Sequence, residues 1–203
     1  MPESAEEVCA RVAALVGDDG RLATPDLSGD VFPWEAEAGA IVVKRLAAPA
    51  PERARGGGAG GAACVSCGPE IHGVIWDDDS WRVKHPPQRT GLPLTLFLET
   101  KAHLDFTDLD DRQAAEFGQL AVRLTRVIES LPEIGRCYVE RWGDGSEHCH
   151  LWFTARTARL PSTRGPYALE WGELIPPGPE EIWRADLAEV ARKLALHGGR
   201  AHV

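Results

Sequence analysis

The sequence has no run of about 18 apolar residues, which a membrane-spanning helix requires. Its N-terminus carries Glu3, Glu6 and Glu7 where a secretory signal would need basic residues and then an apolar stretch, so we expect a cytoplasmic location. Basic residues are also few: 22 Lys and Arg stand against 31 Asp and Glu, a formal net charge of −9. This balance argues against a broad electropositive surface for nucleic acid or a membrane, although a small anionic ligand can still bind locally.

The common phosphate-binding loops are missing as well. G-x-x-x-x-G-K-[ST] does not occur, and strict alternation of strands and helices is absent. The spacing G-x-G-x-x-G occurs at Gly56, Gly58 and Gly61, but within a loop rich in Ala and Gly and not between a strand and a helix. Rossmann and P-loop folds therefore have no support. The composition, with 43% hydrophobic and 26% charged residues over a length of 203, is that of an ordinary globular protein.

Hydrophobic periodicity predicts helices and strands in the order helix, strands, helix, strands, helix. This order favours an α+β fold, with helices packed on an antiparallel sheet. The expected helices lie within residues 4–17, 107–131 and 180–196, and the expected strands within 41–43, 73–76, 81–83, 92–98, 137–142 and 148–154. Between them, residues 47–63 are rich in Ala, Gly, Pro and Arg, and we expect a mobile loop there.

Five cysteines, an odd number, include the pair Cys64 and Cys67 in a C-x-x-C spacing followed by Gly68. Two thiolates can hold Zn²⁺ at about 2.3 Å, but a tetrahedral site needs two further donors. No second C-x-x-C exists, and the remaining candidates are His72, His85, His103, His148 and His150. Two other interpretations stay open: a thioredoxin-type redox pair, and two unpaired structural cysteines.

A second motif is H-x-H-x-W, at His148, His150 and Trp152. Side chains alternate across a strand, so these three are expected on one face. Two adjacent imidazoles favour metal binding or catalysis, although a solvent-facing pair is the simpler alternative. Both could also share one ion with a water at an open position. Trp152 could stack on a base, wall off a site, or be a core aromatic beside the long helix.

Four elements in this order resemble the histidine triad superfamily, including its galactose-1-phosphate uridylyltransferase branch. They are Cys64-x-x-Cys67, the segment from Phe97 to His103, the long helix, and Gly143-x-Gly145-Ser146-x-His148-x-His150-x-Trp152. The resemblance covers about residues 62–160. It implies a single domain over residues 1–203, with an N-terminal extension over 1–61 and a C-terminal helical extension over 161–203.

In zinc-containing members of this superfamily, the C-x-x-C pair, a histidine after the preceding strand and the first histidine of H-x-H hold the metal. Carried over, the resemblance implies that Cys64, Cys67, His103 and His148 bind zinc. The family nucleophile, which attacks the α-phosphorus of a nucleotide, corresponds to His150.

The resemblance also implies contacts with the phosphate from Gly145 and Ser146, which resemble the family's small residues before the strand. The departure is Trp152, which stands where the hydrolases have a third histidine and the uridylyltransferases have glutamine. Because an indole has one N–H donor and no acceptor, Trp152 cannot shuttle a proton.

The function expected from this resemblance is a nucleotidyl hydrolase or transferase that acts on nucleotides or small phosphorylated compounds through a nucleotidyl intermediate on His150. One alternative is a non-catalytic, zinc-stabilised nucleotide-binding module. Another is a hydrolase that uses a zinc-bound water. Because dimers are common in the family, the resemblance further implies a homodimer.

Overall fold

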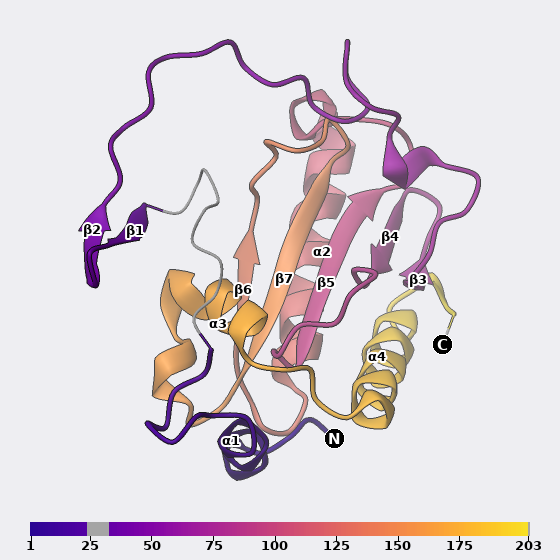
Figure 1. Ribbon diagram of the computed structural model, residues 1–203. Coiled ribbons are helices and arrows are strands. Elements are labelled where there is room, and N and C mark those ends of the chain that lie inside the picture. The colour runs from indigo at the N-terminus through magenta and orange to yellow at the C-terminus, as the bar shows by residue number, and fades with distance from the viewer. Residues whose placement is uncertain (24–32, 203) are drawn as a thin grey trace.

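The computed structural model describes residues 1–23 and 33–202. Its main element is a six-stranded sheet in the order β6-β7-β5-β4-β3-β8, in which every neighbouring pair is antiparallel. Helices pack against this sheet (Figure 1), so the α+β fold expected from the sequence is confirmed. The strands of the sheet are β3 (Val74–Asp77), β4 (Trp81–Lys84), β5 (Leu94–Thr100), β6 (Ile134–Glu140), β7 (His150–Thr157) and β8 (Arg200–Ala201).

The described α-helices are α1 (Ala5–Ala13), α2 (Asp111–Glu129), α3 (Ala168–Leu174) and α4 (Glu180–Ala195). Helix α2 begins at a capping box in which Asp110 and Gln113 satisfy each other's backbone N–H groups. It ends before Pro132, as the sequence predicts. Helices α2 and α4 contact each other and together cover one face of the sheet.

The core lies between these two helices and the sheet. Alternate residues of β5 and β7 point into it, among them Leu96, Leu98 and Phe153, which are fully buried. The intervening residues therefore point to the opposite face, which has no long helix over it in Figure 1. This opposite face, called the open face below, carries Phe97, Glu99, His150 and Trp152.

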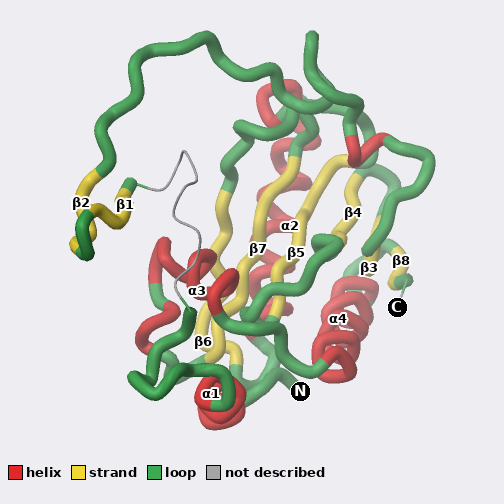
Figure 2. The backbone as a smooth tube through the Cα atoms, in the orientation of Figure 1, coloured by secondary structure: helices red, strands yellow, loops and turns green. Residues whose placement is uncertain are grey.

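Two differences from the expected elements concern the ends of the chain. The C-terminal segment contains a strand, β8, which the sequence does not predict and which pairs with β3. A separate hairpin of β1 (Trp34–Glu37) and β2 (Ala40–Val43) lies away from the sheet, and only its second strand was expected. From this hairpin a long connection runs over the end of the sheet to the cysteine pair (Figure 2). No helix in the described part of the chain is both long and apolar enough to cross a membrane.

Candidate metal centre and adjoining histidine

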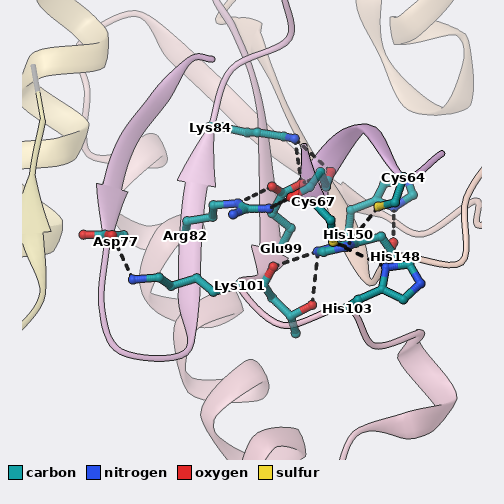
Figure 3. Close-up of polar contacts among 12 residues, drawn as sticks. Cys64, Cys67, Asp77, Arg82, Lys84, Glu99, Lys101, His103, His148 and His150 are labelled. Carbon is teal, nitrogen blue, oxygen red and sulfur yellow. Dashed lines mark hydrogen bonds and ion pairs between the residues drawn. The ribbon is translucent and has the colours of Figure 1, made fainter. Parts of the chain in front are cut away.

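Four potential metal ligands come together at one end of the sheet. Cys64 and Cys67 flank a short 3₁₀ turn, His103 follows β5, and His148 precedes β7. The four ligand atoms all lie within 4.8 Å of one another. Figure 3 shows the cysteine turn facing the two imidazoles. Since β5 and β7 are paired, their ends carry the two histidines to the same place.

The spacing of these atoms fits a tetrahedral zinc ion. The Nδ1 atom of His148 lies 3.4 Å from the Cys64 sulfur and 3.3 Å from the Cys67 sulfur, and Nδ1 of His103 lies 3.5 Å from the Cys67 sulfur. Zinc bonds of about 2.3 Å to sulfur and about 2.0 Å to nitrogen give a tetrahedral sulfur–nitrogen edge of about 3.5 Å. Two thiols and two imidazoles also form one of the usual donor sets for structural zinc.

The orientation of His148 suits a metal ligand. Its Nε2–H donates to the carbonyl oxygen of Thr100 at 2.7 Å, which leaves the lone pair of Nδ1 directed at the two sulfurs. The residue is 1% exposed, and burial lowers the pKa of its imidazole below the ordinary value. The ring is therefore held neutral, the protonation state that binds a metal.

The pKa of the Cys67 thiol is shifted in the opposite direction. Burial and the neighbouring Cys64 raise the pKa of this thiol above its ordinary value. Without a cation, Cys67 is therefore held protonated at neutral pH. Zinc binding must displace this proton, so its affinity depends on pH.

A buried ionic cluster holds the cysteine turn against the sheet. Glu99, 1% exposed, accepts from Nζ of Lys84 at 2.9 Å and from the hydroxyl of Ser66 at 3.0 Å, and it forms an ion pair with Arg82. Arg82 also donates to the carbonyl oxygen of Ser66, one of the two residues between the cysteines. The turn is thus positioned by β4 and β5 as well as by its own backbone (Figure 3).

Sequence reasoning missed this cluster. The available signal was the charged residues Arg82, Lys84 and Glu99 inside otherwise apolar strands, because charges are rarely buried without partners.

His150, the first residue of β7, lies beside the metal centre and is not one of the four grouped ligands. Its Nδ1–H donates to the carbonyl oxygen of His148 at 2.7 Å. Its Nε2 atom has no hydrogen-bond partner among the residues that the structure describes. The two histidines therefore do not act as a side-by-side pair: the ring of His148 faces the cysteines, and His150 belongs to the open face.

The turn before β7 is braced by the connection that the sequence suggested was a mobile loop. The N–H of Gly56 donates to the carbonyl oxygen of Gly145, and the N–H of Glu147 donates to the carbonyl oxygen of Gly56. The hydroxyl of Ser146 accepts from the N–H of His148 at 3.1 Å. By contrast, the N–H groups of Gly145 and Ser146 have no acceptor within the described ranges.

Trp152 lies on the open face, two residues beyond His150. Its ring meets that of Phe97 edge to face, with the centroids 4.6 Å apart. Its neighbours Leu151 and Phe153 point into the core, so Trp152 points away from α2 and is not a core aromatic beside the long helix. The structure thus places Trp152 next to His150.

No family model and no curated protein matches the sequence. Among solved structures, the chain is similar to a histidine triad protein from Bradyrhizobium japonicum, with 17% identity, a TM-score of 0.48, and coverage of 59% of this chain and 88% of that one. A hypothetical histidine triad nucleotide-binding protein from Sulfolobus tokodaii gives 12% identity, a TM-score of 0.49, and coverage of 66% and 93%.

A Zn-bound histidine triad family protein from Mycobacterium smegmatis gives 17% identity, a TM-score of 0.45, and coverage of 61% and 86%. The family that the sequence motifs resemble therefore recurs among these structures. Because the TM-scores lie below 0.5, the function has to be inferred from the residues of this chain.

Proposed function

We propose that the protein binds zinc through Cys64, Cys67, His103 and His148, and that it hydrolyses or transfers nucleotidyl groups through a covalent intermediate on His150. The observation that carries this proposal is the hydrogen bond from Nδ1–H of His150 to the carbonyl oxygen of His148. It fixes the tautomer in which Nε2 holds the free lone pair, and a neutral imidazole so oriented is a usable nucleophile at pH 7.

The reaction would proceed in two displacements. Nε2 of His150 attacks the α-phosphorus of the substrate, the bond from phosphorus to the leaving group breaks, and the leaving group departs with the electron pair and takes a proton from solvent. Water or another hydroxyl acceptor then attacks the same phosphorus and loses its proton to solvent, while the bond from phosphorus to Nε2 breaks and His150 leaves with the electron pair. Covalent capture divides one difficult phosphoryl displacement into two easier ones.

The turn before β7 supplies donors for the phosphate oxygens in this proposal. The N–H groups of Gly145 and Ser146 lack acceptors in the described chain, and backbone N–H groups in a tight turn favour an anion. The bracing by Gly56 holds this turn in place, through the carbonyl oxygen of Gly145 and the N–H of Glu147. The ligand class that we propose is accordingly a nucleotide or another small phosphorylated compound.

When bound, zinc would supply structural cross-linking between the cysteine turn and the start of β7. Four protein donors would fill a tetrahedral site and would leave no position for water, which disfavours the alternative of a hydrolase using a zinc-bound water. The ligand His148 also carries the carbonyl oxygen that orients His150. The proposed metal centre would therefore affect the chemistry by fixing the carbonyl oxygen of His148, which orients the ring of His150.

A non-catalytic nucleotide-binding module is the second candidate, and Trp152 favours it. An indole cannot give the leaving group a proton and take it back, so a residue that commonly assists the departure is lacking here. In that case the fold, the metal and the binding site are retained without turnover.

The test is to incubate the protein with nucleoside 5′-phosphorofluoridates of the four common bases and to analyse it by mass spectrometry. We expect a nucleotidyl adduct on His150 and no adduct in His150→Ala. The control His202→Ala should give an undiminished adduct, because His202 pairs with Asp77 of β3, near the opposite edge of the sheet from β7. Absence of any adduct, together with unchanged nucleotide affinity in His150→Ala, would establish the module instead.

A further inference from the structure

Three polar side-chain atoms on the paired strands β6 and β7 are buried without any hydrogen-bond partner in the described part of the chain. They are Oε2 of Glu140, Nε1 of Trp152 and Oγ1 of Thr154. Thr154 is 0% exposed. Burial of a polar atom without a partner is unfavourable, so such atoms on neighbouring residues of two paired strands indicate a site that a ligand completes.

The register of the sheet places these three residues on the same face as His150, with Trp152 adjacent to it on that face. Glu140 lies directly opposite Trp152 in the pairing of β6 with β7. His150, Trp152 and Thr154 are alternate residues of β7, so all three side chains leave the same face of the sheet. Glu140 is also the diagonal neighbour of His150 across the paired strands, and such neighbours lie about 7–8 Å apart.

The chemistry of the three atoms is mixed. The indole of Trp152 only donates, the carboxylate of Glu140 only accepts, and the hydroxyl of Thr154 can do both. A single hydroxyl group can accept from the indole and donate to the carboxylate at once. A phosphate group without a proton offers only acceptors, so it would leave Glu140 unpaired and add a like charge beside it.

The surroundings of Glu140 make a second negative charge there unfavourable. Burial raises the pKa of its carboxyl group, and the nearby carboxylate of Glu170 on α3 raises it further. The site is therefore already short of positive charge. A ligand group that brings another negative charge beside Glu140 would be repelled by this carboxylate and by that of Glu170.

We infer that Glu140, Trp152 and Thr154 form a subsite for a neutral, hydroxyl-bearing leaving group, an alcohol or sugar esterified to the nucleotide, and that this subsite discriminates against a second phosphate. The inference rests on the proposed function in placing the substrate's phosphorus at His150. It adds the chemical class of the group beyond that phosphorus. Trp152 then determines specificity where a proton shuttle would otherwise stand.

The experiment compares two ligands that differ only at this position: the glycerol ester of a nucleoside 5′-monophosphate and the corresponding nucleoside diphosphate, for each common base. Binding is measured by calorimetric titration of His150→Ala, which prevents turnover. We expect the ester to bind at least tenfold more tightly than the diphosphate. In the same background, Trp152→Phe should weaken ester binding at least fivefold, because the ring remains while the N–H donor is lost.

Glu140→Gln separates charge from shape. It keeps a carbonyl acceptor and removes the negative charge, so diphosphate affinity should rise several-fold while ester affinity stays within about twofold. Matched controls are Trp142→Phe, at a 56% exposed tryptophan of the same β6–β7 hairpin, and Glu173→Gln, at an exposed carboxylate on α3. Both should leave the two affinities unchanged. Zinc content and thermal unfolding verify that each variant is folded.

The inference is overturned if neither ligand binds, if the diphosphate binds as tightly as the ester, or if Glu140→Gln leaves their ratio unchanged. These results are separate from the adduct test. An adduct on His150 without ligand preference refutes the subsite alone, whereas the preference without an adduct supports the subsite and refutes covalent catalysis.

Discussion

Replacing Glu99 by Gln tests how the buried ionic cluster supports the metal centre. Glu99 is the single acid between Arg82 and Lys84, whose side chains are 6% and 14% exposed. Glu99→Gln keeps the shape of the side chain and removes its charge. Both cations are then left in a nearly dry environment without a counter-ion, and Ser66 loses a charged hydrogen-bond partner.

The magnitude follows from this burial. Breaking a buried ion pair on one side costs about 3–5 kcal/mol, against a total stability of about 5–15 kcal/mol for a folded protein. Since urea lowers stability by about 1–3 kcal/mol per molar, the midpoint of unfolding should fall by about 1–5 M. Because Ser66 lies between Cys64 and Cys67, we also expect zinc affinity to fall by about 10–100-fold.

The assay is urea unfolding of the zinc-loaded and chelator-treated protein, together with competition for zinc against a chromogenic chelator. The control is Glu180→Gln, since Glu180 pairs with Arg184 at the surface, where an ion pair contributes about 1 kcal/mol or less. A destabilisation by Glu99→Gln that does not exceed that of the control, with unchanged zinc affinity, would refute this account of the cluster.

Three further predictions concern the metal site and a buried acid. Gly57 has a φ of +87°, and a Cβ added there would lie 2.6 Å from Cε1 of His103, so Gly57→Ala should lower zinc affinity in the same competition assay. The control is Gly60→Ala, which should leave zinc affinity unchanged, because Gly60 has a similar φ of +75° and an added Cβ would meet only the Cβ of Ala54 at 4.0 Å. Because the pKa of the Cys67 thiol is raised, zinc affinity should increase with pH through the neutral range. A zinc affinity that does not change with pH would contradict the conclusion that Cys67 is protonated without a metal. Burial raises the pKa of Asp186 from 3.8 to about 6, so its folded form holds its proton more tightly than the unfolded chain, and stability should fall as pH rises from about 4 to about 6. Asp186→Asn should therefore stabilise the protein by up to about 3 kcal/mol at pH 7 and little below pH 4, as measured by urea unfolding at both pH values.

The sequence predicts the central part of the sheet because its patterns are local. The long apolar stripe that ends at Pro132 indicates α2, and the glycine turn at residues 143–145 indicates the β6–β7 hairpin. Strand limits are less accurate: β6 begins at Ile134 and ends at Glu140, whereas residues 137–142 were expected. The pairing of β6 with β7 fixes these limits, and propensity alone does not.

Long-range contacts explain the elements that sequence reasoning did not predict. Strand β8 has two residues and forms only because β3 offers it an open edge. Gly56 is ordered by Gly145 and Glu147, about 90 residues later in the chain. In the same way, the set of four metal ligands depended on a family resemblance, because the spacing of the motifs left five histidines as candidates.

The wide separation of the proposed zinc ligands along the chain has a consequence for biosynthesis. Cys64 leaves the ribosome 84 residues before His148, a delay of roughly 4–17 s at about 5–20 residues per second. During this interval the nascent polypeptide exposes a thiol pair whose imidazole partners have not all been made. Capture of the ion must therefore follow translation of the hairpin, and oxidants in the cell have a brief opportunity to reach the unprotected sulfurs first.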